Sequence, residues 1–208
     1  MRTRIKFCGM TRADDIAHAV AFGVDAIGLI LVPGSKRELS LEQAVELSRA
    51  VPPLVSIVCL TADAEEARVR EILRRMRVDL LQFHGKETDQ QCKLYGRPFV
   101  KAVAMGDDDA AVQLKSWPSA AALVLDGHRS GELGGQGLRF DWSKEFERGA
   151  QPMVLAGGLD EHNVATAIAA MRPYAVDVSS GIESAPGIKD RKRMEAFISE
   201  VQRADKQR

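Results

Sequence analysis

Short apolar runs alternate along the whole chain with segments that have helical spacing. The runs have the length and composition of strands that are buried on both faces, as in a parallel sheet. The segments between them are rich in Ala, Glu, Arg and Leu, and the clearest helices are predicted over 64–76 and 161–171. The pattern predicts strands over 4–8, 26–31, 54–60, 80–84, 99–104, 121–126, 152–156 and 175–179.

Several of the predicted helices begin at a capping box, in which a side-chain oxygen and a residue three positions later satisfy free backbone N–H groups. The pattern occurs at Ser40 with Gln43, Asp63 with Glu66, and Thr88 with Gln91. The weakest helix has only 141–148 available, and the last helix is predicted over 190–203.

Strands that alternate with helices can form a closed parallel barrel or an open doubly wound sheet. Eight evenly spaced strands favour the α/β fold of a (β/α)8 TIM barrel. At 208 residues the chain is short for this fold, so most loops must be minimal, with 127–139 as the exception. Because no linker or shift in composition divides the chain, we predict one domain over 1–208.

Charge and cysteine content exclude several classes of function. The 29 basic and 29 acidic residues balance to a formal net charge of +0. This balance argues against binding to nucleic acid or to a membrane surface, which requires a basic face. The 3 cysteines have no CxxC spacing, which argues against a disulfide framework and a zinc cluster. With no signal peptide recognisable, we expect a cytoplasmic protein that needs no metal, cofactor or obligatory protein partner.

Polar side chains collect on the predicted inner face of the barrel, where alternate strand residues point. In strand 99–104, for example, Val100 and Ala102 are expected to face the helices, which turns Lys101 inward. The predicted inner set is Lys6, Cys8, Gln82, His84, Lys101, Asp126 and Asp177. Buried polar groups cost free energy unless they are paired, so this set requires an explanation.

Two explanations remain open for the inner polar set. One is structural ion pairing of Lys6 or Lys101 with Asp177, which we favour for Lys101. The other is chemistry at the carboxyl ends of the strands, where barrel enzymes place their active sites. Cys8, His84 and Asp126 occupy such ends. Cys8 also shares its face with Lys6, and a nearby cation favours the reactive thiolate, whereas Cys59 and Cys92 are interpreted as packing residues.

Two glycine-containing turns follow the last two predicted strands. Gly157 and Gly158 come at the end of strand 152–156, and Ser179, Ser180 and Gly181 come at the end of strand 175–179. Barrel loops at these positions often bind phosphate through backbone N–H groups, although glycines also end strands without binding anything. Arg37 could hold a second anionic group such as a carboxylate across the mouth, or be a solvated loop charge.

Several motifs together resemble one known family. They are Lys6-Phe7-Cys8-Gly9-Met10-Thr11, Gln82-Phe83-His84-Gly85, Leu125-Asp126, Phe140-Asp141-Trp142, Ala156-Gly157-Gly158-Leu159, Val176 to Glu183, Pro186-Gly187 and Lys189-Asp190. With these motifs the chain resembles the phosphoribosylanthranilate isomerases of tryptophan biosynthesis. The resemblance runs from the first strand to about residue 190.

The resemblance implies an Amadori rearrangement of N-(5-phosphoribosyl)anthranilate without a metal or cofactor. It implies that Asp126 is the general acid that opens the ribose ring and that Cys8 is the general base that removes the C2 proton. It further implies phosphate binding by Gly157, Gly158, Ser179, Ser180 and Gly181, and carboxylate binding by Arg37. His84 and Asp177, which face the predicted interior of the barrel, complete the expected substrate-binding set.

Two departures from the family pattern and two rival functions accompany this hypothesis. Ser35-Lys36-Arg37 stands where the family usually has Ser-Pro-Arg, which should loosen that loop, and Gly134-Gly135-Gln136-Gly137 replaces Gly-Gly-Thr-Gly in a candidate lid. One rival is another phosphosugar isomerase, although the related histidine-pathway isomerases have an aspartate in place of Cys8. The other is a barrel that binds a phosphorylated ligand without catalysis.

Overall fold

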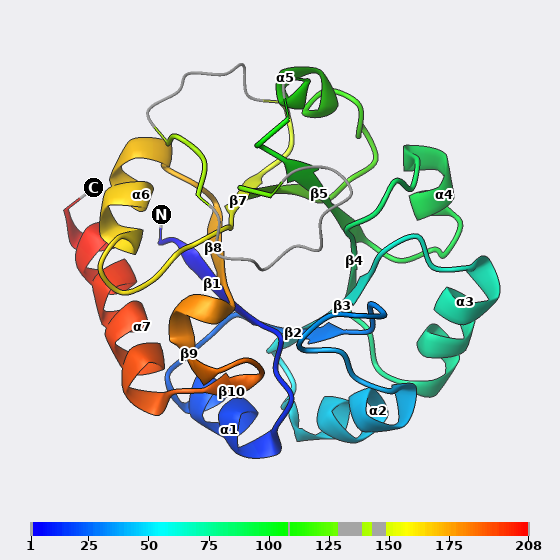
Figure 1. Ribbon diagram of the computed structural model, residues 1–208, viewed down its shortest axis with the longest axis horizontal. Coiled ribbons are helices and arrows are strands. Elements are labelled where there is room, and N and C mark those ends of the chain that lie inside the picture. Colours follow the sequence, from blue (N-terminus) through cyan, green and yellow to red (C-terminus); the bar gives the residue numbers. More distant parts are fainter. Residues whose placement is uncertain (1, 108, 129–138, 143–148, 208) are drawn as a thin grey trace.

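The computed structural model describes residues 2–107, 109–128, 139–142 and 149–207 of the chain. Eight parallel strands form a closed barrel, in which every strand pairs with the next one in the sequence and β8 pairs with β1 (Figure 1). The strands are β1 (Arg4–Cys8), β2 (Ala26–Ile30), β3 (Ser56–Thr61), β4 (Leu80–Phe83), β5 (Phe99–Ala104), β6 (Ala122–Asp126), β7 (Met153–Leu155) and β8 (Ala175–Val178). The predicted barrel and its eight strands are confirmed.

Helices surround the barrel on its outer side (Figure 1). They are α1 (Ala13–Ala21), α2 (Leu41–Ala50), α3 (Glu66–Arg75), α4 (Asp89–Lys93), α5 (Ala110–Gln113), α6 (Val164–Met171) and α7 (Arg191–Lys206). Of the predicted helix 141–148, positions 143–148 lie outside the described residues. No helix in the described ranges combines the length and apolar character needed to cross a membrane.

Two of the three predicted capping boxes are confirmed. The Ser40 and Thr88 side chains each accept a hydrogen bond from the backbone three residues later, and Gln43 and Gln91 complete the two boxes. Both side chains therefore satisfy N–H groups that the first turns of α2 and α4 leave free.

The capping box predicted at Asp63 is wrong. Helix α3 has Glu65 at its N-cap position, without a side-chain cap. The Asp63 carboxylate instead accepts a hydrogen bond of 2.6 Å from the backbone N–H of Lys86, and its own N–H donates to Glu87 at 2.8 Å. Asp63 thus ties the loop after β3 to the loop after β4, a tertiary contact that a local spacing pattern does not reveal.

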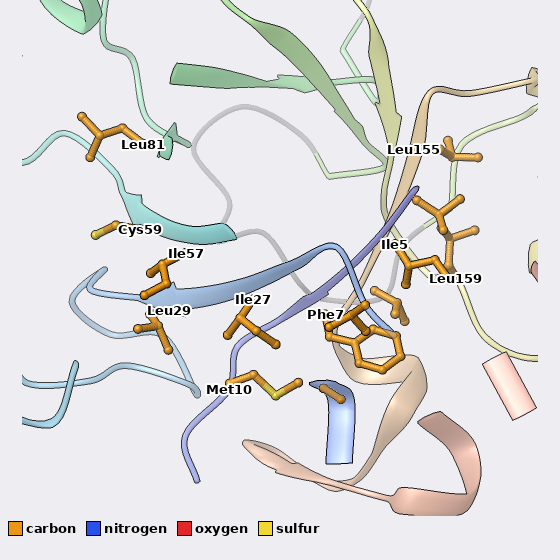
Figure 2. Close-up of a cluster of buried hydrophobic side chains, with 14 of the residues drawn as sticks. Ile5, Phe7, Met10, Ile27, Leu29, Ile57, Cys59, Leu81, Leu155 and Leu159 are labelled. Carbon is orange, nitrogen blue, oxygen red and sulfur yellow. The ribbon is translucent and has the colours of Figure 1, made fainter. Parts of the chain in front are cut away.

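The main core lies between the strands and the helices. Figure 2 shows part of it, where side chains such as Phe7, Ile27 and Ile57 from successive strands join one cluster. A second cluster, which includes Val124 and Val154, fills the barrel interior with smaller side chains. The outward and inward alternation predicted from the sequence holds for β1, β4, β6 and β8.

The facing predicted for β5 is wrong. Val100 and Ala102 belong to the interior cluster, whereas Phe99 and Val103 pack in the layer toward the helices. Lys101 lies on the same side of the strand as Phe99 and Val103, where its ammonium is 5.0 Å from the Trp117 ring centroid. The bulkier side chains occupy the roomier outer layer, which turns the lysine away from the interior.

Lys101 accordingly does not pair with Asp177. Its Nζ lies 3.1 Å from a carboxylate oxygen of Glu87 and also donates to the backbone carbonyl of Gly85. The partner of Asp177 is Lys6, with an Nζ–Oδ2 distance of 2.6 Å inside the barrel. The structural ion pair predicted for Lys6 and Asp177 is therefore confirmed, and the one between Lys101 and Asp177 is corrected.

After β8 the chain forms elements that the sequence pattern did not predict. A short 3-10 helix, η1 (Ser180–Ile182), leads into a hairpin of β9 (Glu183–Ala185) and β10 (Ile188–Lys189), and α7 follows. The hairpin carries Glu183 and Lys189, both buried, toward the carboxyl end of the barrel.

Candidate active site

A cavity opens at the carboxyl ends of the strands and encloses about 790 Å³ of space that is continuous with solvent. Its lining includes nine of the ten residues predicted for the site. They are Cys8, Arg37, His84, Asp126, Gly157, Gly158, Asp177, Ser179 and Ser180. The structure thus brings together residues from strands and loops that span the chain from position 8 to position 180.

Cys8 ends β1 and packs against Val58 and Leu60 inside the barrel. Burial raises the pKa of its thiol above the ordinary value, and the Lys6 ammonium lowers it only in part. Lys6 does lower the pKa of the Cys8 thiol, as predicted. The pKa is nevertheless raised overall, because the effect of burial is larger than the effect of the lysine. The raised pKa favours the protonated thiol at Cys8.

Asp126 ends β6 between two histidine side chains. Its Oδ1 lies 3.3 Å from His128 Nδ1, and its Oδ2 lies 3.7 Å from His84 Nε2. Burial alone would raise the pKa of Asp126, but the contacts with His128 and His84 outweigh burial and lower the pKa below its ordinary value. Asp126 is therefore a carboxylate in the unliganded protein.

The two glycine-containing turns lie next to each other because β7 and β8 are neighbours. Gly157 and Gly158 both have left-handed backbone conformations, with φ of 81° and 63°. The side-chain amide of Asn163 holds the turn by donating to the Gly158 carbonyl at 3.0 Å. Glycine adopts this conformation without steric cost, and successive backbone N–H groups in such a turn can face one anion.

Gly181 is the one predicted site residue outside the cavity lining. A Cβ atom at this position would overlap the backbone carbonyl oxygen of Leu159, in the loop after β7. Gly181 therefore lets the loops after β7 and β8 touch. Gly181 would therefore affect anion binding indirectly, by allowing these two loops to pack together. The direct contact with phosphate that was predicted from the sequence would not be its role.

A comparison with known proteins decides the family of this barrel. The model of the N-(5'-phosphoribosyl)anthranilate (PRA) isomerase family matches residues 5–200. The chain belongs to this family. It is 46% identical over 208 residues to the N-(5'-phosphoribosyl)anthranilate isomerase of Stenotrophomonas maltophilia (strain R551-3), covering 98% of this chain and 95% of the relative.

Solved structures of PRA isomerases share the fold over almost the whole chain. The Thermotoga maritima enzyme superposes with a TM-score of 0.85 at 33% identity, covering 96% of this chain and 98% of that one. A PRA isomerase in complex with reduced 1-(o-carboxyphenylamino)-1-deoxyribulose 5-phosphate superposes with a TM-score of 0.83 at 31% identity, over 96% and 98% of the chains. The resemblance seen in the motifs is confirmed, and the protein is an isomerase.

One departure from the PRA isomerase pattern lies in the loop that carries Arg37. Although Lys36 stands where the family usually has proline, the Arg37 side chain is buried and held by Glu183 of the hairpin. Within the loop, the Arg37 N–H also donates to the Ser35 hydroxyl at 3.2 Å. The second departure, Gly134 to Gly137, and most of the predicted lid 127–139 lie outside the described residues.

Three residues near the PRA isomerase cavity had no role assigned from the sequence. Glu183 holds Arg37, and Lys189 donates from Nζ to the Ser179 carbonyl at 3.1 Å and to Glu183 at 2.8 Å. Both occur in the motifs of the resemblance, which was the available signal. His128 has no such signal, because only the turn after β6 brings its ring to Asp126.

Proposed function

We propose that this chain converts N-(5'-phosphoribosyl)anthranilate into 1-(2-carboxyphenylamino)-1-deoxyribulose 5-phosphate, an Amadori rearrangement in tryptophan biosynthesis. The observation that supports this most directly is that Cys8 and Asp126 line one cavity with the two adjacent turns after β7 and β8. A structural neighbour whose ligand is the reduced form of this product supports the same substrate class.

The order of strands around the barrel suggests how the substrate lies. Strands β7 and β8 stand between β6 and β1 in the closed sheet. A phosphate held by backbone N–H groups at Gly158 and Ser180 would have Asp126 on one side and Cys8 on the other. The ribose would then extend from the phosphate across the mouth between the proposed acid and base.

Asp126 would act first, as the general acid. Protonation of the furanose ring oxygen breaks the C1–O bond and leaves a Schiff base between C1 and the anthranilate nitrogen. Because Asp126 is ionised in the unliganded protein, it must gain a proton when substrate binds. The anionic substrate favours that gain, since negative charge and loss of water both raise a carboxyl pKa.

Cys8 would act second, as the general base. The cationic Schiff base beside it favours the thiolate, which offsets the effect of burial on the thiol pKa. The thiolate takes the C2 proton, the C–H electron pair forms a C1–C2 double bond, and the π pair of the C1–N double bond returns to the nitrogen, which gives an enolamine. The enolamine then tautomerises to the ketone, so that two hydrogens have moved and no external oxidant or reductant is used.

The remaining parts of the proposal concern the rest of the site and the chain. Arg37 would face the anthranilate carboxylate, and His84 and Asp177 would line the ribose portion of the cavity. We infer that residues 1–208 act as one domain without a cofactor or an obligatory protein partner. The cytoplasmic location expected from the sequence stays a prediction.

A fluorescence assay with phosphoribosylanthranilate tests the function, because turnover changes the sugar carbon bonded to the anthranilate nitrogen and should therefore change the anthranilate-type fluorescence. We expect turnover by the native chain and a loss of about 100-fold or more in Cys8→Ala and in Asp126→Asn. Both variants should still bind a phosphorylated product analogue, and Cys59→Ala, which changes a buried cysteine outside the cavity, should turn over normally. An inert substrate would overturn the function, and normal turnover by both cavity variants would overturn the roles.

A further inference from the structure

Three side chains that coordinate metal ions well meet at the edge of the cavity, which His84 and Asp126 line and which His128 adjoins from the neighbouring pocket. His84 follows β4, Asp126 ends β6, and His128 lies two residues beyond Asp126. One donor atom from each lies within 4.8 Å of the other two. A cluster of metal ligands was not expected from the sequence, because these residues are far apart in the chain or separated by a turn.

The spacing of the donor atoms matches a small coordination sphere. His128 Nδ1 is 3.3 Å from Asp126 Oδ1, and His84 Nε2 is 3.7 Å from Asp126 Oδ2. Two ligands of a tetrahedral Zn²⁺ that bind at about 2.0–2.1 Å lie about 3.4 Å apart. Both histidine–carboxylate distances are thus near the separation found around zinc, and the donor atoms of all three residues lie within 4.8 Å of one another.

The two imidazole nitrogens that face Asp126 lack a hydrogen-bond partner in the described part of the chain. His84 Nε2 and His128 Nδ1 are both buried, and His128 is only 4% exposed. Their contacts with Asp126 are close, but neither has the geometry of a hydrogen bond. Buried polar atoms are nearly always satisfied, and a cation held between these nitrogens and the Asp126 carboxylate would satisfy all three groups.

A second contact orients one of these rings. The Gln82 side-chain amide lies 3.2 Å from His84 Nδ1, the ring nitrogen that points away from Asp126. Histidine ligands are commonly held in this way through their other nitrogen, which directs the coordinating nitrogen at the metal. The His84 and His128 rings also lie face to face at a tilt, with centroids 5.2 Å apart.

We infer that His84, Asp126 and His128 form a three-ligand site for Zn²⁺ or a similar transition-metal dication, with a fourth position open to the cavity. Three protein ligands with one open position are sufficient for zinc. The site would be inhibitory, because a carboxylate oxygen bound to the ion cannot carry the proton that ring opening requires. The inhibition rests on the proposed function of Asp126, whereas the metal binding does not.

Calorimetric titration of the metal-stripped protein with Zn²⁺ tests the site directly. We expect binding of about one ion per chain, and His128→Ala should weaken it at least about tenfold, since loss of an outer-sphere partner alone costs 10–100-fold. His162→Ala, which removes a histidine whose side chain is 84% exposed, is the matched control and should bind as the native chain does. Equal affinity in the native chain and in His128→Ala would overturn the site.

Cys8 is the alternative zinc ligand in the same cavity, so it needs its own test. Cys8→Ser should keep the zinc affinity, and Co²⁺ bound to the native chain should show no thiolate charge-transfer band. Loss of binding in Cys8→Ser would overturn the site. His128→Gln, checked for folding by circular dichroism, repeats the test with a side chain closer in size to histidine.

Turnover measured with added Zn²⁺ separates the two proposals. In a chain that isomerises phosphoribosylanthranilate, Zn²⁺ should inhibit over the concentration range in which it binds, and His162→Ala should be inhibited equally. A chain that binds Zn²⁺ through His128 but never turns over substrate keeps the metal site and loses the proposed function. A chain that turns over substrate but does not bind Zn²⁺ keeps the function and loses the metal site.

Discussion

The guanidinium of Arg37 and the carboxylate of Glu183 form a two-pronged ion pair at the barrel mouth, with Nε–Oε1 and Nη2–Oε2 distances of 2.7 Å each. Both side chains are buried, and Lys189 adds a second cation to the same carboxylate. The planar guanidinium of Arg37, which suits a carboxylate, thus already binds the carboxylate of Glu183 within the protein. Glu183 therefore sets the direction of Arg37, so that under the proposed function the substrate carboxylate would meet an arginine that is already fixed.

Replacing Glu183 by Gln should show this dependence. The substitution keeps the size of the side chain but leaves Arg37 and Lys189 buried without their anion. We expect the KM for phosphoribosylanthranilate to rise more than kcat falls, and the free energy of unfolding to drop by about 3 kcal/mol. Steady-state kinetics and denaturant unfolding measure the two effects. Glu46→Gln, the control, breaks an exposed Arg–Glu pair. It should lower the free energy of unfolding by less than about 1 kcal/mol and leave KM and kcat unchanged.

The stabilising effect of Glu183 should depend on pH in a defined direction. Burial alone would raise the pKa of Glu183, but Arg37 and Lys189 outweigh it and lower the pKa below 4.5. A carboxyl group with a lowered folded-state pKa stabilises the protein above its ordinary pKa and ceases to do so as the pH falls. The difference in unfolding free energy between the native chain and Glu183→Gln should therefore be constant from about pH 7 to 5.5 and shrink below about pH 4.5. A difference that grows toward acid would contradict the assignment.

Gly158 offers a test of the phosphate turn that has a matched control. Its φ of 63° disfavours any side chain, and a leucine there would also enter the cavity. Gly23 has a φ of 87° but only open space around it. Both Gly158→Leu and Gly23→Leu should lose about 1–2 kcal/mol of stability from the left-handed backbone. Only Gly158→Leu should raise KM, and an equal KM in both variants would place the phosphate elsewhere.

Much of this fold can be predicted from the sequence, because each barrel strand is marked by a hydrophobic pattern within its own few residues. Each strand is a short apolar run, and the inward residues of β1 and β8 differ in polarity from their neighbours, so Lys6 and Asp177 stand out. The pattern fails in β5, where apolar residues line both faces and only the relative bulk of Phe99 and Ala102 tells them apart. Bulk depends on the space between barrel and helices, which the sequence does not show.

In the candidate site, residues at strand ends could likewise be predicted from the sequence, whereas residues placed by loops could not. Cys8 and Asp126 end predicted strands, so their position at the mouth follows from the strand order. His128 reaches Asp126 only through the turn after β6, and Glu183 reaches Arg37 through a hairpin that follows the last barrel strand. Contacts made by loop conformation have no periodic signal, which is why the sequence did not predict these two partners.

The reactivity of Cys8 should report its protonation. Because burial raises its pKa above 9.0, alkylation by iodoacetamide should be slow near neutral pH and should rise about tenfold per pH unit up to about pH 9. Mass spectrometry of the alkylated peptide measures the rate at this site. Cys59 and Cys92, both fully buried with pKa values raised to about 12, should react far more slowly in the folded chain. A rate that is flat between about pH 7 and 8 would mean that the unliganded thiol is already ionised.

The overlap that any Cβ atom at Gly181 would make with the Leu159 carbonyl has a consequence for how this gene can vary. The loops after β7 and β8 can pack against each other because residue 181 is a glycine and has no Cβ atom. Every missense change at codon 181 adds at least that atom, so even alanine must drive the two loops apart. Only synonymous changes keep the spacing, so the packing of these two loops requires that position 181 remain glycine.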